Sequence, residues 1–152
     1  MQRSMLCKCT ALVYGSSPAG QYKGWVSWDC WDCTGIASFL EDCSDVVSYA
    51  KNYLAVHFKL DYVNRDGDIS NYYPDFFVKL SDGRIVVVET KGQEDLDVPL
   101  KTQRLRQWCE DINATQSEVT YDFVYVDQEG FEKYAPKSFS EVLAGFREYK
   151  ET

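Results

Sequence analysis

Residues 72–92 read YYPDFFVKLSDGRIVVVETKG, and this stretch carries most of the information about the fold and the function. Two apolar runs flank a Ser-Asp-Gly turn at 81–83, which predicts strands at about 73–80 and 84–91 joined as a hairpin. An acidic residue lies in the outer part of each run. A carboxylate inside an apolar sheet costs free energy unless something compensates its charge. The hairpin therefore indicates a site as well as a fold.

The length of the turn decides whether the two acidic residues, Asp75 and Glu89, can meet. A two-residue turn would pair Asp75 with Thr90 and send Glu89 to the opposite face of the sheet. A three-residue loop at 81–83 pairs Asp75 with Glu89, and opposed residues share a face. That loop needs a left-handed residue in its last position, which Gly83 supplies. The sequence therefore favours the register that brings the carboxylates together.

These groups predict a metal site. Asp75 and Glu89 are hard oxygen ligands of the kind that Mg²⁺ prefers, with Mn²⁺ as a substitute, and the backbone carbonyl of Thr90 is a further candidate ligand. Lys91 lies two residues beyond Glu89 on the same face, where it would orient an attacking water or stabilise charge on a phosphate. Pro74 removes a backbone donor and predicts a distorted strand end there. The alternative interpretation is an ordinary edge hairpin with a surface Glu-Lys pair.

The remaining pattern predicts an α-β-β-β-α-β-α order, which is an α/β (α+β) fold with a central mixed sheet flanked by helices. Helical spacing begins at Ile36 and predicts one broken helix or two; its apolar positions are Ile36, Phe39, Leu40, Cys43, Val46, Val47 and Ala50. A strand at 54–63 and a turn at 64–67 follow. Pro99 opens a helix whose expected buried residues are Leu100, Leu105, Trp108, Cys109 and Ile112. A strand at 119–126 and a helix at 138–149, started by a Ser138–Glu141 capping box, complete the order.

Composition sets limits on organisation and partners. The 152 residues suggest one domain at 34–152, preceded by an irregular segment at 1–33. No apolar run reaches 18 residues, so we expect no transmembrane helix and a cytoplasmic protein. A net charge of -8, from 24 acidic and 16 basic side chains, argues against sequence-independent adhesion to nucleic acid. Reduced thiols are the first interpretation of the segment 1–33, and a zinc site is the alternative; its cysteines are Cys7, Cys9, Cys30 and Cys33.

Residues 61–113 resemble the endonuclease domain of type III restriction enzymes and related helicase-nuclease subunits, within the PD-(D/E)xK nuclease superfamily. The motifs lie at Pro74-Asp75 and Glu89-Thr90-Lys91. The resemblance implies a restriction-endonuclease-like core, Mg²⁺-dependent hydrolysis of phosphodiester bonds in double-stranded DNA, and two partners: a helicase/ATPase domain or subunit and a methyltransferase subunit. The chain itself has no GxxxxGK[ST] phosphate loop.

Other residues remain open between functional and structural roles. Lys101 and Arg104 share one helix face and are candidates for contact with a DNA phosphate, or simply a solvated face. Many relatives carry an acidic residue on the helix before the first strand, for which Asp32 and Glu41 are loose candidates. A second class of function is also open, namely a catalytically silent module that binds DNA or a partner subunit.

Overall fold

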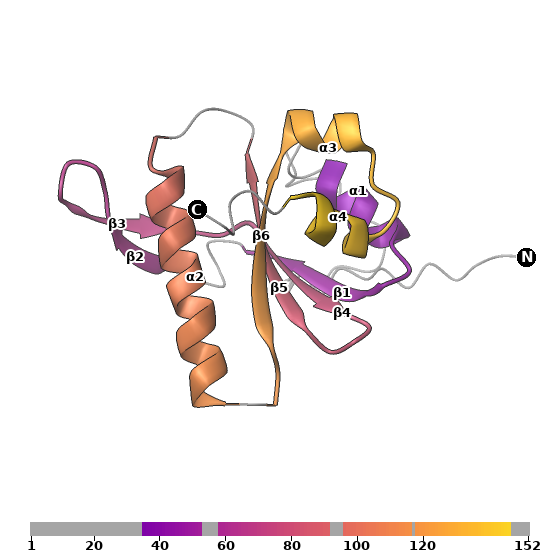
Figure 1. Ribbon diagram of the computed structural model, residues 1–152, viewed down its shortest axis with the longest axis horizontal. Coiled ribbons are helices and arrows are strands. Elements are labelled where there is room, and N and C mark those ends of the chain that lie inside the picture. Colours follow the sequence, from indigo (N-terminus) through magenta and orange to yellow (C-terminus); the bar gives the residue numbers. More distant parts are fainter. Residues whose placement is uncertain (1–34, 53–57, 92–95, 117, 147–152) are drawn as a thin grey trace, which may run out of the picture.

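The computed structural model describes residues 35–52, 58–91, 96–116 and 118–146, and in this range it forms an α+β fold (Figure 1). The elements in chain order are α1 (Ala37–Asp42), β1 (Val46–Lys51), β2 (Leu60–Val63), β3 (Ile69–Tyr72), β4 (Phe76–Leu80), β5 (Ile85–Lys91), α2 (Val98–Thr115), β6 (Tyr121–Asp127), α3 (Gln128–Tyr134) and α4 (Phe139–Gly145). The helices in this range are too short or too polar to cross a membrane.

Four strands form one mixed sheet in the order β1-β4-β5-β6. The strand β4 pairs antiparallel with both β1 and β5, and β5 pairs in parallel with β6. Parallel neighbours need a long crossover, and α2 provides it between β5 and β6. The strands β2 and β3 form a separate antiparallel hairpin that the chain inserts between β1 and β4. The predicted mixed sheet flanked by helices is confirmed.

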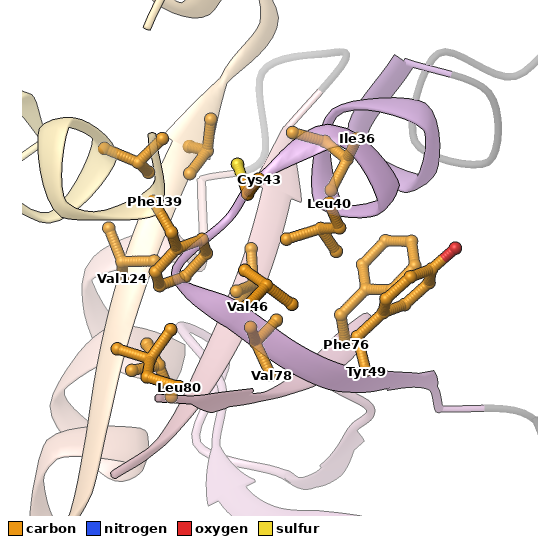
Figure 2. Close-up of a cluster of buried hydrophobic side chains, with 14 of the residues drawn as sticks. Ile36, Leu40, Cys43, Val46, Tyr49, Phe76, Val78, Leu80, Val124 and Phe139 are labelled. Atoms are coloured by element: carbon orange, nitrogen blue, oxygen red, sulfur yellow. The ribbon is translucent and has the colours of Figure 1, made fainter. Parts of the chain in front are cut away.

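The two faces of the sheet carry different layers. Figure 1 shows α2 and the β2–β3 hairpin on one side, and α1, α3 and α4 on the other. The first core cluster lies under α1 and α4 and includes Leu40, Phe76, Val78, Val124 and Phe139 (Figure 2). The second core cluster lies under α2 and includes Tyr62, Tyr72, Val87, Leu105 and Phe123. Because strand side chains alternate between faces, Glu89 belongs to the second side, with Val87 of the same strand.

The segment Val46–Lys51 is a strand, so the prediction that the helical spacing continues through residues 46–50 was wrong. The register of β1 against β4 shifts between Val46 and Ser48, which marks a β-bulge. A bulge inserts one residue and moves the alternation by one position. Val46 and Tyr49 are therefore both buried although they are three residues apart, and Val47 between them is 53% exposed. Three-residue spacing in a bulged strand imitates the spacing of a helix face.

The other predicted elements lie at the expected positions, but some of them are shorter than predicted. Of the predicted strand 54–63, the structure assigns β2 to Leu60–Val63, and residues 53–57 lie outside the described residues. The helix α2 starts after Asp97 with a proline in its first turn, as predicted. The strand β6 and the helix α4 lie where they were predicted, but α4 ends at Gly145 instead of residue 149. In the predicted capping box Ser138 accepts from the Glu141 N–H at 3.3 Å, whereas the Glu141 carboxylate accepts from the Lys137 N–H. The strand β3 and the helix α3 were not predicted.

The cysteine predictions fall on two parts of the chain. The segment 1–33, with Cys7, Cys9, Cys30 and Cys33, lies outside the described residues, so the choice between thiols and zinc stays a prediction. Cys43 and Cys109 are buried cysteines, one in each core cluster. Both act there as small apolar side chains.

Candidate active site

The β4–β5 hairpin has the three-residue loop that the sequence predicted. Lys79 pairs with Ile85 and Phe76 with Val88. The Leu80 N–H donates to the Arg84 carbonyl at 2.9 Å, and the Gly83 N–H donates to the Leu80 carbonyl at 3.0 Å. Gly83 has a φ of 91°, the left-handed backbone that this loop requires. One step further along this register, Asp75 stands opposite Glu89.

Asp75 lies immediately before β4, and it accepts hydrogen bonds from residues on two sides. Its Oδ2 accepts the Thr90 N–H at 2.8 Å and the Thr90 hydroxyl at 2.7 Å. Its backbone carbonyl accepts the Asn52 N–H at 2.7 Å, which continues the pairing of β1 with β4 by one residue. The side chain is half-buried. Thr90 of β5 therefore orients the carboxylate of Asp75, and Asn52 bonds its backbone.

The backbone of Thr90 lies opposite Pro74, which has no N–H to donate. The register places Pro74 opposite Thr90, in the same kind of pair as Leu80 and Arg84, whose backbones bond to each other. Proline has no N–H, so this pair supplies no backbone hydrogen bond to the Thr90 carbonyl. The Thr90 N–H, which a regular pair would direct to a carbonyl, goes to the Asp75 side chain instead. This distortion was expected from Pro74, and it suits the predicted role of the Thr90 carbonyl as a ligand.

Glu89 is bound by a tyrosine from the inserted hairpin. The Tyr72 hydroxyl donates to Glu89 Oε2 at 3.0 Å, and Tyr72 is only 3% exposed. Burial raises the pKa of Tyr72 well above its usual 10.0, and the negative charge of Glu89, its hydrogen bond and the charges of Asp75 and Tyr125 add to this effect. Tyr72 therefore bonds Glu89 directly, whereas the Asp75 carboxylate accepts from Thr90, the residue that follows Glu89.

The three predicted basic residues, Lys91, Lys101 and Arg104, lie in different surroundings. Lys91 ends β5, in register with Asp127 of β6, and its side chain lies outside what the structure describes. The Lys101 ammonium lies 5.9 Å from the ring centroids of both Tyr62 and Tyr72, so Lys101 stands beside the site. Arg104 donates through Nε to the Asp61 carbonyl at 3.0 Å, which fastens α2 to the β2–β3 hairpin.

Acidic residues elsewhere do not join this pair in the described structure. Glu41 of α1 accepts from the Tyr49 hydroxyl at 3.0 Å, and Tyr49 belongs to the first core cluster on the other face of the sheet. Asp32 lies outside the described residues. Within the described ranges, no three His, Cys, Asp or Glu side chains gather as a metal-binding group. Two carboxylates with one backbone carbonyl still fit Mg²⁺, which keeps several waters and often uses only one or two protein carboxylates.

Tyr72 is the site residue that sequence reasoning missed. No period in the sequence marked residues 69–72 as a strand. The sequence held no signal for it, because the contact joins two separate hairpins. No family model, curated protein or solved structure matches this chain. The family resemblance therefore rests on the motifs at Pro74-Asp75 and Glu89-Thr90-Lys91.

Proposed function

We propose that this chain is a Mg²⁺-dependent DNA endonuclease domain of the kind found in type III restriction enzymes. The observation that supports the proposal is the hairpin register: Phe76 pairs with Val88, and the same register continued by one residue sets Asp75 opposite Glu89. Two acidic side chains on one face of a sheet need compensation, and a divalent cation supplies it.

The roles of the residues follow from their chemistry. Asp75, Glu89 and the Thr90 carbonyl would hold Mg²⁺ through hard oxygen atoms. When bound, the ion polarises a phosphodiester oxygen and acidifies water. Lys91 is the proposed catalytic cation, and it would stabilise the charge that develops on the phosphate. Lys101, beside Tyr72, and Arg104, whose Nε bonds the Asp61 carbonyl, are both proposed contacts for the DNA backbone.

The charge of the chain bears on how DNA would arrive. A net charge of -8 does not favour independent capture of a polyanion. We therefore propose that a helicase/ATPase domain or subunit delivers double-stranded DNA, and that a methyltransferase subunit completes a restriction assembly. A cytoplasmic location belongs to the same proposal, because the DNA substrate of such an assembly lies there.

Plasmid nicking by the full chain tests the proposal directly. We expect supercoiled plasmid to be nicked with Mg²⁺ or Mn²⁺, and EDTA to stop the reaction. Asp75→Asn keeps the shape of the side chain but removes its charge, so nicking should fall at least about 100-fold, the scale of losses on removing one charge-stabilising group from an active site. Asp82→Asn is the matched control, since Asp82 lies in the loop at the far end of the same hairpin and bonds Arg84.

The outcomes are separable. Asp82→Asn should nick like the unaltered protein, and thermal unfolding should show that both variants are folded. Nicking that survives Asp75→Asn or EDTA would overturn the assignment.

A silent binding module is the second candidate, and one observation favours it. Each carboxylate already has a hydroxyl partner, Thr90 for Asp75 and Tyr72 for Glu89, so protein donors compensate part of the charge. Calorimetry distinguishes the two functions. No heat of binding for Mg²⁺ or Mn²⁺ would favour the silent module that contacts DNA or a partner subunit.

A further inference from the structure

Tyr72 contacts Glu89 from outside the main sheet. It ends β3 and pairs with Leu60 of β2, in a hairpin that the chain inserts between β1 and β4. Its ring packs in the second core cluster, and its hydroxyl donates to Glu89 Oε2 across 17 residues of sequence. A phenylalanine would fill the same apolar space. The hydroxyl is therefore the part of this side chain that packing alone does not require.

The β2–β3 hairpin is fastened to α2 at two points. The Arg104 Nε donates to the Asp61 carbonyl at 3.0 Å, and the Tyr62 hydroxyl donates to Asp97 Oδ2 at 3.0 Å. Asp97 is the residue that precedes the first turn of α2. These contacts attach the hairpin to α2, and the Tyr72 hydroxyl separately attaches it to β5.

A cation lies beside the same tyrosine. The Lys101 ammonium is 5.9 Å from the centroids of both the Tyr62 and the Tyr72 rings, a distance at which the ring face attracts positive charge. The two tyrosines thus share a cation, and each donates its hydroxyl to a carboxylate at 3.0 Å. They differ in which carboxylate they contact, since only Glu89 belongs to the candidate active site.

We propose that Tyr72 is a positioning residue for the metal site, and that its hydrogen bond fixes the orientation in which the Glu89 carboxylate would bind a divalent cation. This inference rests on the proposed function, because it requires Glu89 to be a ligand. Hydrogen bonds to ligating carboxylates orient them, and loss of such a partner typically weakens metal binding by about 10- to 100-fold.

Titration calorimetry of the full chain with Mn²⁺ tests the proposal in four proteins: the unaltered chain, Tyr72→Phe, Tyr62→Phe and Glu89→Gln. Tyr72→Phe keeps the ring in the core cluster and beside Lys101, and it removes only the hydroxyl. We expect its Kd for Mn²⁺ to rise about 10- to 100-fold. Tyr62→Phe is the matched control, since it loses a tyrosine–carboxylate hydrogen bond of the same length, and its Kd should change less than about 3-fold.

Glu89→Gln separates the two levels of the inference. If the unaltered chain does not bind Mn²⁺, or Glu89→Gln binds it equally well, the proposed function fails and the positioning role fails with it. If Glu89→Gln abolishes binding but Tyr72→Phe binds like the unaltered chain, only the positioning role is overturned. Equal weakening by both tyrosine variants would show a general effect of hairpin packing and would also overturn it.

Plasmid nicking gives a second measurement, the Mg²⁺ concentration for half-maximal nicking, which a purely structural role of Tyr72 would leave unchanged. With Tyr72→Phe, the Mg²⁺ concentration for half-maximal nicking should rise by a similar factor, while the rate at saturating Mg²⁺ is largely kept. Urea unfolding with both tyrosine variants checks that they remain folded at the assay temperature.

Discussion

Replacing Thr90 by valine should lower the free energy of unfolding by about 1–2 kcal/mol. Thr90 is 7% exposed, and its hydroxyl donates to Asp75 Oδ2 at 2.7 Å. A hydrogen bond to a charged group contributes about 1.5–3 kcal/mol, and the methyl group that replaces the hydroxyl regains roughly 0.8 kcal/mol of apolar burial. The Thr90 N–H still donates to Asp75, so the carboxylate keeps one of the two bonds from this residue.

Thr90→Ser is the matched variant, because it keeps the hydroxyl and loses the methyl group. Its expected loss is about 1 kcal/mol, from one buried methyl. Urea unfolding of the three proteins gives the two differences by linear extrapolation, and an Asp75→Asn double-mutant cycle isolates the coupling between the two side chains. If valine were as stable as threonine while serine was less stable, the side chain would act through packing, and the argument that Thr90 positions Asp75 would be refuted.

Two further stability predictions concern loops and the start of α4. Gly83→Ala and Gly67→Ala should each cost about 1–2 kcal/mol, because both glycines have positive φ (91° and 87°) and an added methyl meets no atom within 4 Å; urea unfolding showing a far larger loss at Gly83 would contradict backbone strain as the sole cause. Partial burial raises the pKa of Asp45, but hydrogen bonds from Phe139 and Ser140 outweigh it and hold the pKa below its usual 3.8. A lowered folded-state pKa gives stability that is present above pH 3.8 and is lost as the pH falls through the folded value. Asp45→Asn should therefore weaken the dependence of the unfolding free energy on pH in that acid range, and it should cost about 1 kcal/mol at pH 7, as for a lost helix cap. An unchanged pH dependence would count against this role.

The hairpin could be predicted from the sequence because its information is local. The loop at 81–83 has a glycine at the position that needs left-handed backbone, and that one residue selects the register of the whole pair. The register then places Asp75 opposite Glu89 without any knowledge of the rest of the fold. Pro74 is equally local, since a missing N–H distorts any strand that contains it.

Other features could not be predicted because they depend on distant parts of the chain. The bulge near Val47 exists only in the pairing of β1 with β4, so its sequence alone shows the spacing of a helix. The strand β3 has just four residues, ISNY, and its assignment depends on the partner strand β2. The hydrogen bond from Tyr72 to Glu89 joins two hairpins, and no spacing along the sequence encodes it.

The contact between Asp45 and α4 has a consequence for synthesis on the ribosome. The Asp45 carboxylate accepts from the Phe139 and Ser140 N–H groups, 94 and 95 residues later in the chain. Phe139 and Val142 of the same helix also complete the first core cluster. The β4–β5 hairpin joins residues that are close in sequence, but the part of the sheet face that α4 covers stays exposed until residue 142 has been synthesised and released. An incomplete chain therefore exposes apolar surface of the kind that makes partly folded chains prone to aggregation.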